Sequence, residues 1–183
     1  MTSIPDYCSQ VADVLTALPL ESIARIVEIL AGARREGRQV FILGNGGSAA
    51  TASHFCCDLS KGTIQPGKSR FRVIGLADNM ALFSALANDW GYERVFDGQL
   101  EALAQAGDVA IGISASGNSP NVLRAMQFAH EQGLTTIGLT GFAGGKLKDA
   151  VDVCVVAPCD CMEQIEDVHL VIEHAICTAL REA

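Results

Sequence analysis

The sequence predicts an α/β protein, a three-layer sandwich in which helices cover both faces of a five-stranded parallel sheet. Short apolar runs alternate along the 183-residue chain with longer segments of helical periodicity, the order typical of parallel sheets. Hydrophobic residues make up 49% of the chain and its mean hydropathy is +0.28. Strands buried on both faces explain this apolar composition, and large subunit interfaces explain it equally well.

Five strands are expected, at 39–43, 71–76, 109–113, 135–139 and 152–156. Within 22–36, apolar residues recur at helical spacing from Ile23 to Ala31, which predicts a helix with one buried stripe. No linker or repeat interrupts the chain, so we expect a single domain over 1–183. The expected helices are 6–18, 22–36, 48–60, 80–87, 93–105, 119–132, 146–150 and 162–181.

Charge and composition exclude several classes of function. The net charge is −8 with no basic run, which argues against nucleic acid or anionic membranes as partners. The sequence shows neither a secretory signal nor an apolar stretch long enough to span a membrane, so we expect a cytoplasmic protein. Seven cysteines are expected to be free thiols. A cysteine–zinc site is disfavoured because Cys56-Cys57 and Cys159-x-Cys161 lack the usual ligand spacing.

Two glycine- and serine-rich turns, 44–48 and 114–119, each join a predicted strand to a predicted helix. Such a turn directs free backbone N–H groups and the positive end of a helix dipole at one spot, which favours an anion. Both turns follow carboxyl ends of strands, where ligands bind parallel sheets. Tight turns alone also require glycine. With hydroxyls from Ser48, Ser114, Ser116 and Ser119, however, the pattern favours a small phosphorylated metabolite.

The first turn also fits the dinucleotide fingerprint G-x-G-x-x-A, from Gly44 to Ala49. That fingerprint requires an acidic residue about 20 positions later, at the end of the next strand. The available candidate, Asp78, lies much further along the chain, beyond a loop. We therefore expect no nucleotide cofactor.

Histidines and carboxylates on two predicted helices form a candidate acid–base or metal site. His54 and Asp58 share a helix face at i and i+4, and the last helix carries Glu166 and His174. A solvated surface stripe is the plainer interpretation, but these residue types also serve proton transfer and divalent-metal binding. Eight residues of helix between Glu166 and His174 correspond to about 12 Å. This separation predicts a site completed at a subunit interface.

The chain resembles the sugar isomerase (SIS) domain family, and within it the phosphoheptose isomerases. The resemblance runs from about residue 8 to 180 and is carried by five stretches of sequence. It implies a flavodoxin-like five-stranded sheet and active sites between subunits. It also implies that residues 1–36 are a helical oligomerisation extension that packs a homotetramer. The stretches are GNGGSAATASHFCCDL, ALANDWGY, GDVAIGISASGNSPNVLRA, TIGLTGFAGGKL and EDVHLVIEH.

The resemblance also implies an activity and its residues. Phosphoheptose isomerases convert sedoheptulose 7-phosphate into a heptose 7-phosphate for surface polysaccharide precursors. Asp58 and His174 match the catalytic carboxylate and histidine. The matching zinc ligands are His54, Asp58, Glu166 and His174. The substrate contacts fall on Asn45, Gly46, Gly47, Ser48, Asp89, Ser114, Ser116, Ser119 and Glu166.

Two positions depart from the pattern of the best-known members: Asp58 replaces their Glu, and Glu166 replaces their Gln. Two other functions stay open, a non-catalytic SIS module that binds a sugar phosphate or a protein partner, and an isomerase of another phosphosugar. A complete set of His54, His174 and two carboxylates favours an enzyme, because unneeded buried ionisable groups are costly.

Overall fold

Five parallel strands form the central sheet of the computed structural model, which describes residues 3–182. Their spatial order is β2-β1-β3-β4-β5, so the predicted five-stranded parallel sheet is confirmed. β1 lies between β2 and β3, and Gly44 at its end pairs with Ile113 at the end of β3. The two glycine- and serine-rich turns therefore leave the sheet side by side. The strands are β1 (Gln39–Gly44), β2 (Arg72–Gly75), β3 (Val109–Ile113), β4 (Thr135–Thr140) and β5 (Val153–Val156).

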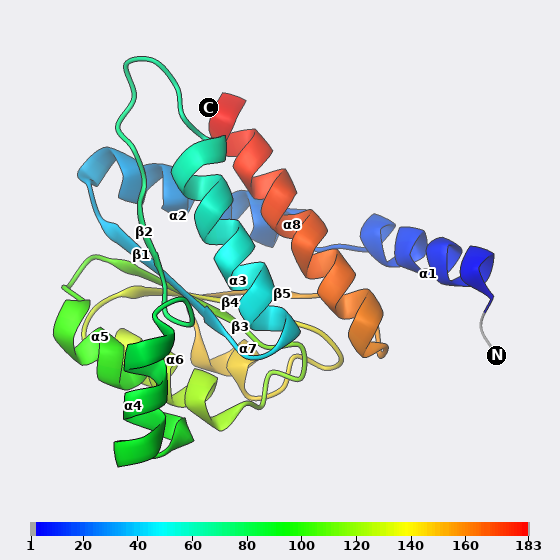
Figure 1. Ribbon diagram of the computed structural model, residues 1–183. Helices are drawn as coiled ribbons and strands as arrows, with labels where there is room; N and C mark the ends of the chain where they lie inside the picture. Colours follow the sequence, from blue (N-terminus) through cyan, green and yellow to red (C-terminus); the bar gives the residue numbers. More distant parts are fainter. Residues whose placement is uncertain (1–2, 183) are drawn as a thin grey trace.

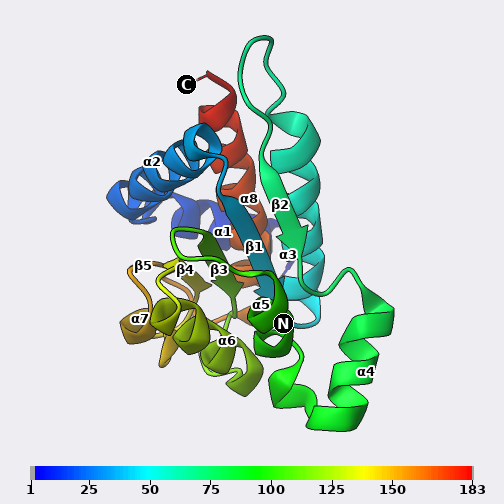
Figure 2. The ribbon, with the colours of Figure 1, turned by 90° about the vertical axis from the view of Figure 1, so that its left-hand side faces the viewer.

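Helices cover the sheet on both faces, each over its own apolar core (Figures 1 and 2). Alternating strand residues separate the cores, since Val40 and Ile42 face one and Phe41 and Leu43 face the other, as expected for a strand buried on both sides. The first face carries α2 (Leu20–Glu36), α3 (Gly47–Cys57) and α8 (Met162–Glu182). The second carries α5 (Asp97–Leu103), α6 (Pro120–Glu131) and α7 (Leu147–Ala150).

The remaining two helices project from this body. α1 (Ile4–Thr16) packs against α8 and extends away from the sheet (Figure 1), with Val14 as its buried residue. α2, by contrast, buries Ile23, Ile26 and Leu30 in the core. α4 (Met80–Trp90) projects beyond the β2 end of the sheet (Figure 2).

Two predicted helices differ from those observed. The segment expected as one helix at 48–60 is α3 followed by a π-helical turn at Asp58–Gly62, a widened turn that is frequent at functional sites. The segment expected at 93–105 divides into a 3-10 turn at Tyr92–Arg94 and the short helix α5. In the described part of the chain, no helix is long and apolar enough to span a membrane. All seven cysteines are free thiols, as expected.

Candidate active site

The two turns form one polar pocket, the serine pocket, at the carboxyl edge of the sheet. Its lining includes the side chains that the sequence predicted for phosphate, Asn45, Ser48, Ser114, Ser116 and Ser119. The first N–H groups of α3, at Gly47 and Ser48, have no partner within their own helix, whereas α6 begins with Pro120, which has no N–H, and the Val122 N–H donates to Asn121 Oδ1. The dipoles of both helices add positive potential there. The pocket therefore offers hydroxyl and amide donors to an anion, as predicted from the sequence.

A reciprocal pair of amides ties the two turns together. Asn45 Nδ2 donates to Asn121 Oδ1 at 2.8 Å, and Asn121 Nδ2 donates to Asn45 Oδ1 at 2.9 Å. The Tyr92 hydroxyl also donates to Asn45 Oδ1, at 2.9 Å. Asn121 is buried and Tyr92 is half-exposed, and neither was predicted from the sequence. Together they hold Asn45 in place at the pocket.

The second turn is shaped by its own polar contacts and by a close neighbour. The hydroxyls of Ser114 and Ser119 lie 3.1 Å apart, and Ser116 Oγ accepts from the Asn118 N–H. Gly117 has φ +63° and lies so close to the Gly144 carbonyl that no Cβ fits. This turn therefore requires glycine for both conformation and space.

Glu166 approaches the phosphate turn from α8. Its carboxylate lies so close to Gly47, at the start of α3, that a Cβ at Gly47 has no room. Glu166 also lines the pocket with Ser48 and the serines of the second turn. The structure thus places Glu166 beside the predicted substrate contacts.

His54, Asp58, Glu173 and His174 form a compact group further along the same two helices. One ligand atom from each lies within 4.8 Å of the others. The Nε2 atoms of His54 and His174 are 3.4 Å apart. Asp58 Oδ2 is 3.9 Å from His54 Nε2 and 3.6 Å from His174 Nε2. Three of these residues were predicted, and Glu173 takes the place in the group for which the sequence had indicated Glu166.

The packing of α3 against α8 explains this exchange of carboxylates. The helices pack side by side and run in the same direction (Figure 1). Glu166 contacts Gly47 at one end of this seam, and Glu173 meets His54 at the other. Glu173 lies seven residues after Glu166, and His54 lies seven residues after Gly47, which is a rise of about 10 Å along either helix. Glu166 and His174 therefore lie toward different ends of the packed helices, and the four members of the group come from one chain. The predicted completion of the site at a subunit interface stays a prediction.

Glu173 is the most deeply placed member of the group. Its side chain is 0% exposed, whereas those of His54, Asp58 and His174 are 45%, 28% and 48% exposed. Burial, with a smaller contribution from the negative charge of Asp58, raises the pKa of Glu173 to about 8. Neither carboxyl oxygen has a hydrogen-bond partner among the described residues. Two imidazoles and two carboxylates, one of them buried and without a hydrogen-bond partner, are a donor set that fits a divalent cation.

Asp89 lies apart from these residues within one chain. It is exposed on α4, accepts a hydrogen bond from Asn88 Nδ2 at 2.8 Å, and does not line the serine pocket. Its predicted contact with substrate stays a prediction, as does metal binding by Glu166.

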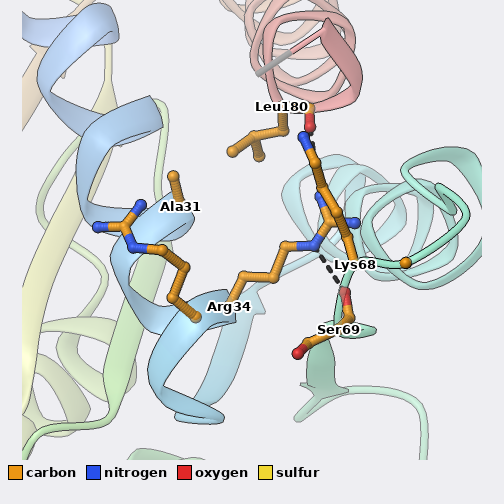
Figure 3. A pocket seen from close by; sticks show the side chains of 7 residues that line it. Ala31, Arg34, Lys68, Ser69 and Leu180 are labelled. Atoms are coloured by element: carbon orange, nitrogen blue, oxygen red, sulfur yellow. Dashed lines mark hydrogen bonds between the residues drawn. The ribbon is translucent and has the colours of Figure 1, made fainter.

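A second pocket, between α2, the loop before β2 and the end of α8, carries a different arrangement (Figure 3). Its buried Arg34 donates to the carbonyl oxygens of Ser69, Leu180 and Thr63 at 2.7, 3.3 and 3.2 Å. Three donors of the Arg34 guanidinium are occupied, so this side chain holds three segments of the chain together. The burial of Arg34 at this pocket is therefore explained by a structural role.

Comparison with known proteins agrees with the geometry of the site. The family model of the SIS domain matches residues 6–141. The chain belongs to the SIS domain family. Among its SIS relatives, the phosphoheptose isomerase of Aliarcobacter butzleri is 43% identical over 160 residues, which cover 87% of this chain and 82% of the relative. The phosphoheptose isomerase of Aquifex aeolicus is 38% identical over 162 residues, or 88% and 84%.

Solved SIS structures show the same fold. A phosphoheptose isomerase from Neisseria gonorrhoeae superimposes with a TM-score of 0.88 at 30% identity, covering 95% of this chain and 92% of that one. One from Francisella tularensis gives 0.87 at 28% identity, with 94% and 91% covered. The resemblance drawn from the sequence motifs is thus confirmed over nearly the whole chain.

Proposed function

We propose that this SIS protein is a phosphoheptose isomerase that converts sedoheptulose 7-phosphate into a heptose 7-phosphate for surface polysaccharide precursors. One observation carries the proposal: an anion pocket and an acid–base group lie at the two ends of the α3–α8 seam. The rise of about 10 Å between Gly47 and His54 is of the order of an extended phosphorylated sugar. The names of the similar proteins support this substrate.

The serine pocket binds the phosphate end of the sugar. Ser48, Ser114, Ser116 and Ser119 offer hydroxyls there, and the helix N-termini supply N–H groups. Binding at this end fixes the reacting end along the seam, so that binding energy is converted into orientation.

Asp58 and His174 carry the proton transfers between C1 and C2. Conversion of ketose to aldose removes a proton from C1, forms an enediol and returns a proton to C2, while another proton moves between the two oxygens. Both side chains are partly exposed and can touch a substrate that lies over the group. Asp58 faces the histidines through Oδ2, which leaves Oδ1 for the proton.

Zinc is the cofactor that we assign to this site, held by His54, Asp58 and His174. When bound, such a cation would stabilise the negative charge that develops on the sugar oxygens.

The assembly that we propose is a cytoplasmic homotetramer. α1 extends from the body (Figure 1), and the apolar side chains of Ile4 and Leu20 are exposed. An exposed apolar surface of this kind supports burial against another subunit. Asp89, which lies outside the pocket of its own chain, is assigned to substrate contact in that assembly.

Turnover of sedoheptulose 7-phosphate by Asp58→Asn and His174→Ala variants tests the proposed function. We expect at least a hundredfold loss of kcat in each, while the substrate still raises the melting temperature because the serine pocket is intact. His130→Ala, a change to an exposed histidine outside the site, is the matched control and should keep full activity. Full activity in both site variants would refute the assignment.

A further inference from the structure

Glu173 is a buried carboxyl group whose surroundings are not explained by proton transfer alone. It lies on α8 with a fully buried side chain, and both of its oxygens lack hydrogen-bond partners among the described residues. Its near polar neighbours are the imidazoles of His54 and His174, at 3.8 and 3.7 Å. A carboxyl group left in this condition destabilises a protein unless it binds something.

We propose that Glu173 is the fourth ligand of a divalent cation that His54, Asp58 and His174 of the same chain also hold. Zinc bonds of about 2.0–2.1 Å in a tetrahedron place neighbouring ligand atoms about 3.3 Å apart. Five of the six separations between ligand atoms in the group run from 3.4 to 3.9 Å, and all six lie within 4.8 Å. Shortening these separations by at most about 1.5 Å therefore closes the group around one cation.

Charge supports the same assignment. Two neutral imidazoles and two carboxylates together carry a charge of −2, which one divalent cation neutralises. Within the described chain, no lysine or arginine forms an ion pair with Glu173 or Asp58. The cation thus supplies the compensation that buried carboxylates need.

Glu166 stays outside this centre. It lies seven residues before Glu173 on α8 and contacts Gly47, seven residues before His54 on α3. About 10 Å of helix rise separates the two carboxylates. Four ligands from one chain therefore complete the centre, and Glu166 is left at the phosphate pocket.

The four ligands differ in their access to a substrate. Glu173 forms the buried floor, while Asp58 and His174 lie at the exposed rim. Glu173 is therefore a positioning residue that holds the cation from below. This inference rests on the proposed function only for the role of the cation in turnover, since metal binding is measured separately.

Zinc titration of the chelator-stripped full chain, by calorimetry or by competition with a chromophoric chelator, tests the assignment. We expect Glu173→Gln to weaken zinc binding at least a hundredfold. The matched control, Glu166→Gln on the same helix, should stay within about threefold of wild type. Cobalt in place of zinc gives a second readout, because its visible spectrum reports coordination number. Circular dichroism confirms that both variants are folded.

Four results would overturn the assignment: no zinc binding by the wild type, unchanged affinity in Glu173→Gln, a comparable loss in Glu166→Gln, or an unaltered cobalt spectrum in Glu173→Gln. Turnover of sedoheptulose 7-phosphate on the same samples separates this inference from the proposed function. Zinc binding with the expected pattern but no turnover supports the ligand and contradicts the function. Turnover without zinc binding supports the proposed function and contradicts the assignment of Glu173 as a ligand.

Discussion

Replacement of Glu173 by leucine should stabilise the metal-free protein. The folded state holds the pKa of this carboxyl at about 8 against an ordinary value of 4.5. At pH 7 the unfolded chain ionises Glu173 and the folded chain must keep it protonated. Each pKa unit corresponds to 1.36 kcal/mol, so the 2.5 units between 4.5 and 7 cost about 3 kcal/mol. Glu173→Leu removes this cost and leaves no polar atom unpaired.

The sign of the pH dependence follows from the raised pKa. Ionisation of the carboxyl adds no cost below pH 4.5, because both states are then protonated, and this cost grows until pH 8. The advantage of Glu173→Leu should therefore be about 3 kcal/mol at pH 7 and below about 1 kcal/mol at pH 5. Urea unfolding in the presence of EDTA, followed by circular dichroism at both pH values, measures it.

Zinc should reverse the order of the two proteins. At a concentration one thousand times its Kd, a ligand that binds only the folded state adds about 4.1 kcal/mol, which exceeds the cost of about 3 kcal/mol. The wild type should gain this stability, and Glu173→Leu should gain much less. Equal stability of the two proteins in EDTA at pH 7, or an advantage that does not shrink toward pH 5, would refute the reasoning.

Three further predictions concern the turns and α8. Asn121→Ala removes a partner of Asn45 and should raise KM for the phosphosugar about tenfold, with a smaller change in kcat, at a stability cost of about 1–2 kcal/mol; unchanged KM would contradict a positioning role. Gly117→Ala should cost about 2–5 kcal/mol in urea unfolding, from φ strain and a clash with backbone. Gly37 also has a positive φ, but open space surrounds it, so Gly37→Ala should cost only the backbone strain. Equal losses of stability in the two variants would exclude the clash as a cause of the Gly117→Ala loss. Burial lowers the pKa of His169, so stability is lost as pH falls below 6.5. His169→Leu should flatten that decline, measured as the melting temperature between pH 7 and 5. Parallel pH curves for the wild type and the variant would exclude His169 as the source of the decline.

Much of the fold is visible in local sequence patterns. Strand and helix periods differ, and the glycine and serine turns mark where each strand ends, so the five strands and the phosphate pocket follow from neighbours in sequence. The break between Arg94 and Asp97 and the π-helical turn at Asp58 carry no such local signal. The 3-10 turn packs against α4 and α6, and the π-helical turn packs against α8 and β2, so both depend on contacts that the local sequence does not show.

The acid–base group shows where sequence reasoning ends. His54 and Asp58 are related by helix spacing alone, but their partner carboxylate depends on how far α8 is shifted along α3. A shift of two turns exchanges Glu166 for Glu173. The eight residues between Glu166 and His174 predicted that one ion would strain to reach both, and the i, i+7 relation of the two glutamates was the available signal for the alternative.

Nuclear magnetic resonance of the wild-type protein with sedoheptulose 7-phosphate in deuterated water tests the central claim most directly. We expect a heptose 7-phosphate to appear with deuterium at C2, because protons on Asp58 and His174 exchange with solvent. Absence of the aldose product, from protein that is folded and supplied with zinc, would contradict the account.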